Sequence, residues 1–125
     1  MSLKTVFSLS AIVAGFFALV TLLIPSTMLS WYGPGPVSVS DTTILMTRFF
    51  GVGLLAVALI TFYLKNSELT TDVKSVVLAI MISDIVGFIV ALWCQFTKLL
   101  NNFGWLTVII YGFFSIALYL IYKKK

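Results

Sequence analysis

The sequence contains no histidine and only one cysteine, Cys94, among its 125 residues. An intrachain disulfide needs two cysteines, and the common zinc sites and histidine-ligated haems need clusters of Cys or His. The lack of histidine also excludes Ser-His catalysis, and a thiol oxidoreductase motif needs a second cysteine. These absences predict no cofactor and argue against an enzyme.

Charged residues are also scarce. They make up 10% of the chain, against about 25% in an average soluble domain, whereas hydrophobic residues make up 61%. The eight basic residues give a net charge of +4. They are distributed between apolar blocks rather than gathered on one face, which argues against nucleic acid as a partner. The composition predicts an integral membrane protein, with the lipid bilayer as its surroundings.

Four apolar blocks are long enough to cross the hydrocarbon core as helices, which takes about 20 residues each. The first is interpreted as a helix rather than a signal peptide, because its apolar run exceeds about 15 residues and lacks an Ala-x-Ala exit. Short connections favour a single all-α domain, an up-down bundle of four transmembrane helices. The predicted spans are residues 5–24, 43–64, 75–96 and 105–122.

The polar breaks between the blocks carry turn and helix-start signals. Pro25 is expected to stop the first helix, and Trp-Tyr-Gly-Pro-Gly-Pro at residues 31–36 predicts a stiff loop. Residues 40–43 and 70–72 offer N-cap oxygens to the second and third spans. The short connection at residues 101–104 predicts that the third and fourth spans form an antiparallel hairpin.

Basic residues are concentrated at one end of the predicted bundle. Only Lys98 falls at the opposite end, where Trp31, Trp93 and Trp105 suggest an aromatic belt. By the positive-inside rule both termini are expected in the cytoplasm, in a multi-pass protein of the cell inner membrane. The lysines on the side of the termini are Lys4, Lys65, Lys74, Lys123, Lys124 and Lys125.

Small residues recur at helical spacing within the spans. In lipid, helices associate through close backbone packing, so these stripes mark helix contacts, either within one bundle or at a subunit interface. The Gly51 and Gly53 pair lies inside an apolar span, which favours packing over a dinucleotide-binding loop. The candidate packing residues are Ser10, Ala14, Gly15, Ala18, Gly51, Gly53, Ala79, Ser83, Gly87 and Ala91.

Two ionisable residues interrupt the spans. Asp84 is predicted near the midplane, surrounded by small residues at the same depth, namely Gly15, Gly53 and Ser115. A charged carboxylate there costs about 2.5–3.5 kcal/mol, so without a cation Asp84 is expected to be neutral. Arg48 lies about six helical residues from Asp84 in depth. That separation leaves a direct ion pair between them open.

Arg48 is expected either to extend toward lipid headgroups or to occupy a polar pocket that opens to the outer face. The partners expected in such a pocket are Gln95, Tyr111, carbonyls of the 31–36 loop, or an anionic group of a ligand. The candidate ligand-binding residues are Arg48, Asp84, Gln95, Tyr111 and Ser115.

Three segments resemble those of a known group of membrane proteins: residues 47–55, 87–92 and 101–105. On these segments, the chain from about residue 45 to 120 resembles small uncharacterised bacterial four-helix membrane proteins, loosely similar to the DoxX type. The resemblance implies a four-helix architecture in the bacterial inner membrane, and it implies no activity.

Two functions fit these features. The first is a non-enzymatic subunit, assembly factor or homo-oligomer that contacts partner chains through its small-residue stripes. The alternative is a transporter or binding protein for a lipid or other small amphipathic molecule that uses Asp84 and Arg48, because ionisable residues within spans are candidates for function. An enzyme using Asp84, Arg48 and Tyr111 ranks third, since nothing in their spacing requires catalysis.

Overall fold

The computed structural model describes residues 2–32, 40–97 and 102–124, where helix is the regular secondary structure. The four longest helices are each long and apolar enough to cross a membrane. The prediction of an all-α chain with four candidate membrane spans is therefore confirmed. These helices are α1 (Leu3–Leu23), α3 (Asp41–Leu64), α4 (Thr71–Phe96) and α5 (Gly104–Tyr122).

Side-chain hydroxyl groups cap the N-termini of α3 and α4, as the sequence predicts. The Oγ of Ser40 accepts a hydrogen bond from the backbone N–H of Thr43 at 3.2 Å. The Oγ1 of Thr70 accepts one from the backbone N–H of Val73 at 3.3 Å. Each bond satisfies an N–H group that has no partner within the first turn of its helix.

A short helix corrects the prediction for the segment after α1. Because α2 (Pro25–Tyr32) follows α1 after a single residue, Trp31 and Tyr32 are helical rather than part of a loop. Pro25 does end α1, but it also begins α2, since a proline in the first turn of a helix needs no N–H bond. The rest of the predicted loop falls in residues 33–39, outside the described residues.

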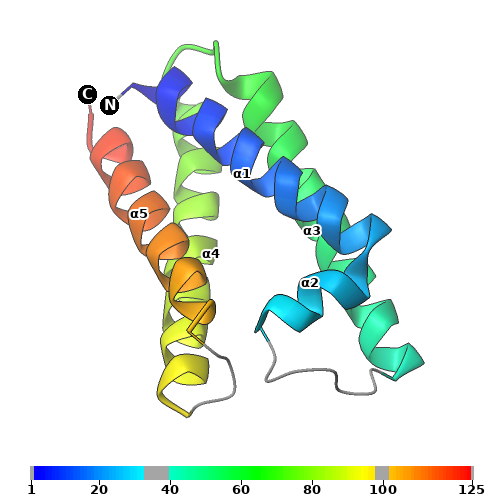
Figure 1. Cartoon of the computed structure of the whole chain (residues 1–125). Helices are drawn as coiled ribbons and strands as arrows, with labels where there is room; N and C mark the ends of the chain where they lie inside the picture. Colours follow the sequence, from blue (N-terminus) through cyan, green and yellow to red (C-terminus); the bar gives the residue numbers. More distant parts are fainter. Residues whose placement is uncertain (1, 33–39, 98–101, 125) are drawn as a thin grey trace.

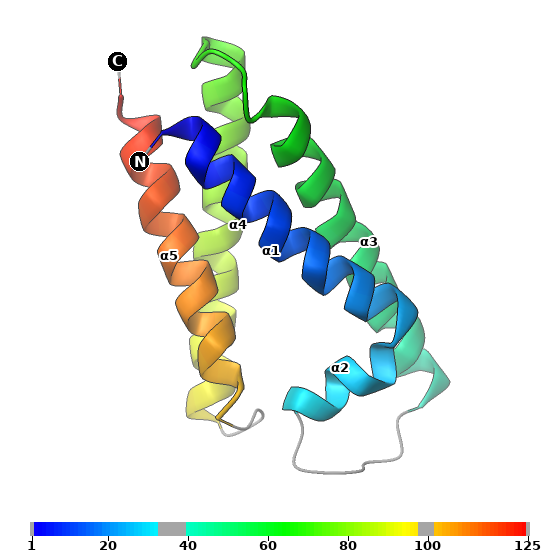
Figure 2. The same ribbon diagram turned by 45° about the horizontal axis from the view of Figure 1, so that its top comes forward.

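The long helices pack as two antiparallel pairs, α1 with α3 and α4 with α5 (Figure 1). The α4–α5 pair is the antiparallel hairpin that the sequence predicts. Figures 1 and 2 show both termini at the same end of the molecule as the α3–α4 connection. Toward the opposite end the two pairs diverge, and α2 extends from the first pair toward α5 (Figure 2).

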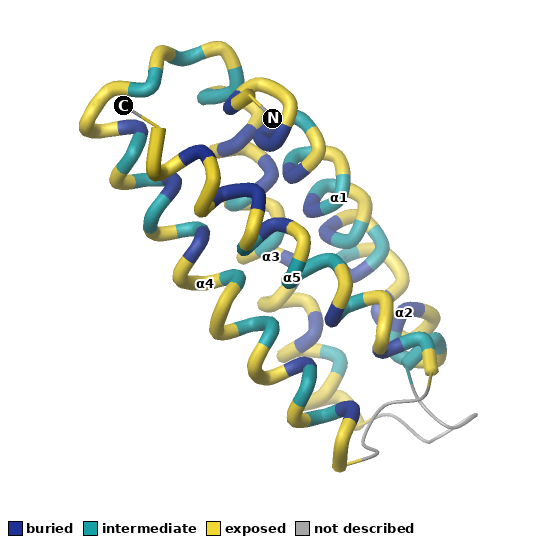
Figure 3. The backbone as a smooth tube through the Cα atoms, turned by 90° about the vertical axis from the view of Figure 1, so that its left-hand side faces the viewer, coloured by how far each residue is buried: buried dark blue, intermediate teal, exposed yellow. Residues whose placement is uncertain are grey.

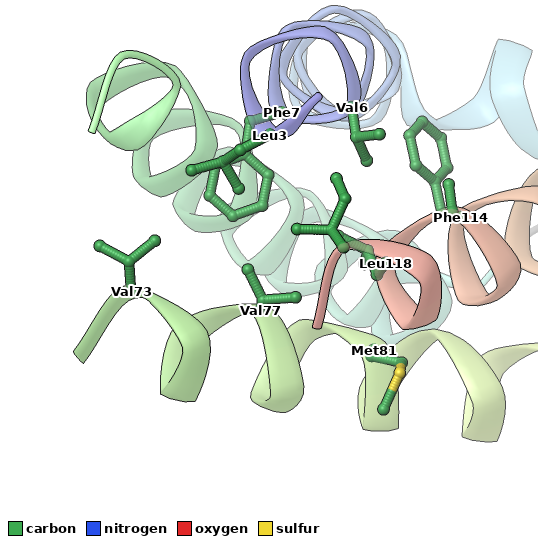
Figure 4. Close-up of a cluster of buried hydrophobic side chains, with 10 residues drawn as sticks. Leu3, Val6, Phe7, Val73, Val77, Met81, Phe114 and Leu118 are labelled. Atoms are coloured by element: carbon green, nitrogen blue, oxygen red, sulfur yellow. The ribbon is translucent and has the colours of Figure 1, made fainter. Parts of the chain in front are cut away.

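One apolar core joins the two pairs near the termini. Within it, Val6, Phe7, Val77 and Ile121 are completely buried. Away from the core, exposed positions cover the outward faces of the helices (Figure 3). The core side chains come from α1, α4 and α5, and most of them are labelled in Figure 4. They are Leu3, Val6, Phe7, Val73, Val77, Met81, Phe114, Ala117, Leu118 and Ile121.

Small residues allow α1 and α3 to approach closely. A Cβ atom at Gly51 of α3 would stand 3.0 Å from Cγ of Leu22 and 3.2 Å from Cβ of Thr21, both on α1. A Cβ at Gly15 would lie 3.9 Å from Cβ of Ala58, which is ordinary contact. Close backbone approach of this kind holds helices together in lipid. The buried small residues on α1 are Ser10, Ala14 and Ala18.

Candidate functional site

Asp84 lies on the inward face of α4, yet it is only half-buried. Met81 and Ala91 occupy the same strip of this helix, three residues before and seven after Asp84, and both are buried. The side chain of Asp84 is therefore less buried than its neighbours on this strip, and it lies in the part of the molecule where the two helix pairs diverge. No hydrogen bond or ion pair joins Asp84 to another residue in the described part of the chain.

Tyr111 of α5 lies against α4 one turn from Asp84. Three of its ring carbons stand 2.7 to 2.9 Å from the position that a Cβ atom would take at Gly87. The ring therefore rests directly on the backbone of α4, and only glycine leaves room for it. Asp84 is close enough to Tyr111 to interact with it electrostatically. The structure thus brings together two of the predicted ligand-binding residues.

Helix α2 brings a second phenol close to Tyr111. The hydroxyl of Tyr32 shares a hydrogen bond of 2.7 Å with Oγ1 of Thr107, which lies one turn before Tyr111 on α5. The Tyr32 ring also packs edge-on against Phe103, with 4.9 Å between ring centroids. Burial raises the pKa of Tyr32, so its hydroxyl stays neutral and able to donate. Tyr32, Thr107, Tyr111 and Asp84 are called the polar cluster below.

The sequence pattern did not identify Tyr32 as a site residue, because it predicted a loop at this position. One feature of the sequence could have indicated a helix instead. Reading Pro25 as the first residue of a helix would have put Tyr32 in the second turn of that helix, on the same face as Met28. Met28 is buried, so this face of α2 is directed into the protein.

Two other predicted ligand-binding residues lie outside the polar cluster. Ser115 donates its hydroxyl hydrogen to the backbone carbonyl of Tyr111 at 2.7 Å, so that hydrogen is used within α5 rather than by Asp84. Gln95 is buried near the C-terminal end of α4, about three turns beyond Asp84.

Arg48 faces away from the α4–α5 pair. Leu64 packs against the core from α3, and a rotation of about 100° per residue places Arg48 about 160° around the helix from it. The Arg48 side chain is exposed beside the exposed Leu45 and Val52. It forms no hydrogen bond or ion pair with the residues that the structure describes. The ion pair with Asp84 that the sequence left open is therefore not formed, and the predicted partners at positions 33–36 lie outside the described residues.

Some candidate packing residues are exposed in the described part of the chain. A Cβ atom at Gly53 would meet nothing within 4 Å, and Ala79 and Ser83 are exposed on α4. The expectation that Gly15 and Gly53 surround Asp84 is also corrected, because Gly15 faces α3 and Gly53 faces open space.

A shallow groove of about 450 Å³ lies between α2 and the first turns of α3. Because Met28 lines the groove and Tyr32 lies one turn further along α2, this helix borders both the groove and the polar cluster. The lining is mostly apolar and consists of Met28, Leu29, Ser40, Thr42, Thr43, Met46, Thr47 and Phe50.

No family model, no curated protein and no solved structure matches this chain. Over the described residues, no group of three or more His, Cys, Asp or Glu side chains is placed to hold a metal ion. The side chains of the polar cluster can form hydrogen bonds and an ion pair with a bound molecule, and apolar surface lies beside them.

Proposed function

We propose that this chain is a non-enzymatic membrane protein that binds a lipid or another small amphipathic molecule, whose polar group meets the polar cluster between the two helix pairs. The observation that carries the proposal is Asp84. It is a half-buried acid inside a candidate span, and none of the described residues forms a hydrogen bond with it. Such a group is costly at this depth unless it is paired, and a donor on a ligand supplies the pair.

The neighbouring residues supply the rest of a binding site. The ring of Tyr111 rests on the backbone of α4, because Gly87 has no side chain to displace it. Its hydroxyl can either donate or accept a hydrogen bond, as the ligand requires. The groove beside α2 offers apolar surface for a hydrocarbon chain. Since Met28 of the groove and Tyr32 of the cluster lie one turn apart on α2, we propose that one molecule places its chain in the groove and its polar group toward the cluster.

Native mass spectrometry of the purified protein, released from mild detergent, tests the proposal. The wild type should retain a small molecule, and Asp84→Asn and Tyr111→Phe should each lose most of it. Tyr119→Phe is the matched control, because this tyrosine lies on the same helix but is 54% exposed. If all four proteins retained the same amount of the same molecule, or if the wild type retained none, the proposed function would be wrong.

We also propose that the protein spans the bacterial inner membrane with both termini in the cytoplasm. The lysines of the described residues lie at the end of the molecule that holds the termini, in agreement with the positive-inside rule. In a Cys94→Ser background and in intact cells, an impermeant thiol reagent should label Thr42→Cys but not Asn66→Cys. The reverse pattern would overturn this orientation.

A role as a subunit, assembly factor or homo-oligomer is the second candidate. Most of the small residues that suggested it are used between helices of the same chain, but Ala79 and Ser83 are exposed on α4. If they form an interface, Ser83→Leu should dissociate an oligomer that Val86→Leu, at a neighbouring exposed position, leaves intact. A wild type that is monomeric in mild detergent, with no partner captured by crosslinking in cells, would remove this candidate.

A further inference from the structure

We infer that the polar cluster selects amphipathic molecules that carry a protonated amine. This inference rests on the proposed binding function and names the class of ligand. It is argued from the charges around Asp84 and from the hydrogen-bonding capacity of the residues beside it.

No basic side chain of the described residues lies near Asp84. Lys74, the basic residue of the same helix, is ten residues away, which is about 15 Å along the helix axis. The other described lysines belong to the end of the molecule that holds the termini. Arg48 faces away from the α4–α5 pair. An ion pair for this carboxyl group must therefore come from a bound molecule.

The polar cluster contains one acid and three hydroxyl groups, and it contains no cation. Without a cation Asp84 is expected to be neutral, and the negative charge of a phosphate or carboxylate headgroup would oppose its ionisation, because repulsion is weakly screened inside a membrane. An alcohol would form only neutral hydrogen bonds with the acid. An ammonium group offers three donors. It lets Asp84 ionise in a complex that is electrically neutral, and Tyr111, whose ring rests on α4 one turn from Asp84, offers its hydroxyl as an acceptor for the remaining donors.

The expected selectivity follows from the strength of these bonds. Hydrogen bonds between an ammonium and a carboxylate are roughly twice as strong as neutral ones. This difference corresponds to a preference of roughly fivefold to tenfold for an amine over an alcohol with the same hydrocarbon chain.

Three probes with the same chain test the inference: dodecylamine, dodecanol and dodecyl phosphate. Their affinities for the purified full-length protein are compared by native mass spectrometry in one non-ionic detergent. The wild type should bind the amine roughly fivefold to tenfold more tightly than the alcohol, and the phosphate most weakly. Asp84→Asn should bind amine and alcohol equally. Asp72→Asn, which changes an exposed acid in the first turn of the same helix, should keep the preference.

The outcomes separate the inference from the function on which it rests. If the wild type bound the alcohol as well as the amine, or preferred the phosphate, and Tyr111→Phe weakened that binding, the amine inference would be overturned and the proposed function would stand. If the wild type bound none of the probes, or bound them as well as Tyr111→Phe does, both would be overturned. The comparison of probes on the wild type needs no variant, so it is decisive even if Asp84→Asn does not fold.

Discussion

Replacing Gly51 by alanine should weaken the packing of α1 on α3, whereas the same replacement at Gly53 should not. A Cβ atom at position 51 would stand 3.0 Å from Cγ of Leu22 and 3.2 Å from both Cβ and Cγ2 of Thr21. At position 53 it would meet no atom within 4 Å. The two glycines belong to the same helix and differ in what faces them.

The size of the effect follows from two opposing contributions. Alanine is favoured over glycine inside a helix by about 0.5–1 kcal/mol, and this gain applies at both positions. The collision applies only at Gly51, where overpacking typically costs about 1–3 kcal/mol. Thr21 cannot easily move aside, because it is completely buried and its β-branched side chain has few rotamers. We therefore expect Gly51→Ala to be about 1–3 kcal/mol less stable than Gly53→Ala.

Thermal unfolding followed by circular dichroism, with both variants in the same detergent, measures this difference. The comparison of two Gly→Ala variants cancels the helix-propensity contribution, so the remaining difference reports the contact with Thr21 and Leu22. Equal midpoints, or a lower midpoint for Gly53→Ala, would show that α1 does not approach α3 at Gly51.

Three further changes should have distinct effects. Gly87→Ala should displace the ring of Tyr111 from α4 and reduce ligand retention in native mass spectrometry as far as Tyr111→Phe does. Ser40→Ala removes the N-cap bond of α3 and should cost about 1 kcal/mol in thermal unfolding. Leu118→Ala should cost about 2–5 kcal/mol in the same assay, because Leu118 is 1% exposed, and Leu120→Ala, at 42% exposed, should cost less. Equal losses for the two leucines would contradict the assignment of the core.

The sequence by itself determined the features that depend on local physical chemistry. An apolar block of about 20 residues must satisfy its backbone hydrogen bonds internally in lipid, so the four long helices were predictable from block length. The hydroxyls of Ser40 and Thr70 lie next to the N–H groups that they cap, so these helix starts could also be read directly. Asp84 was recognisable as a candidate for function because a span rarely carries an acid.

The tertiary structure alone decided how these features combine. The small-residue stripes indicate that helices approach closely, but they do not specify the partner helix, so the use of Gly51 and the exposure of Gly53 emerged only from packing. The depth of a residue in the membrane does not specify the direction it faces, and only the structure shows that Arg48 faces away from the helix pair that carries Asp84. Tyr32 joined the polar cluster because a proline that stops one helix can begin the next, and because the fold brings Tyr32 within hydrogen-bond distance of Thr107, 75 residues away in sequence.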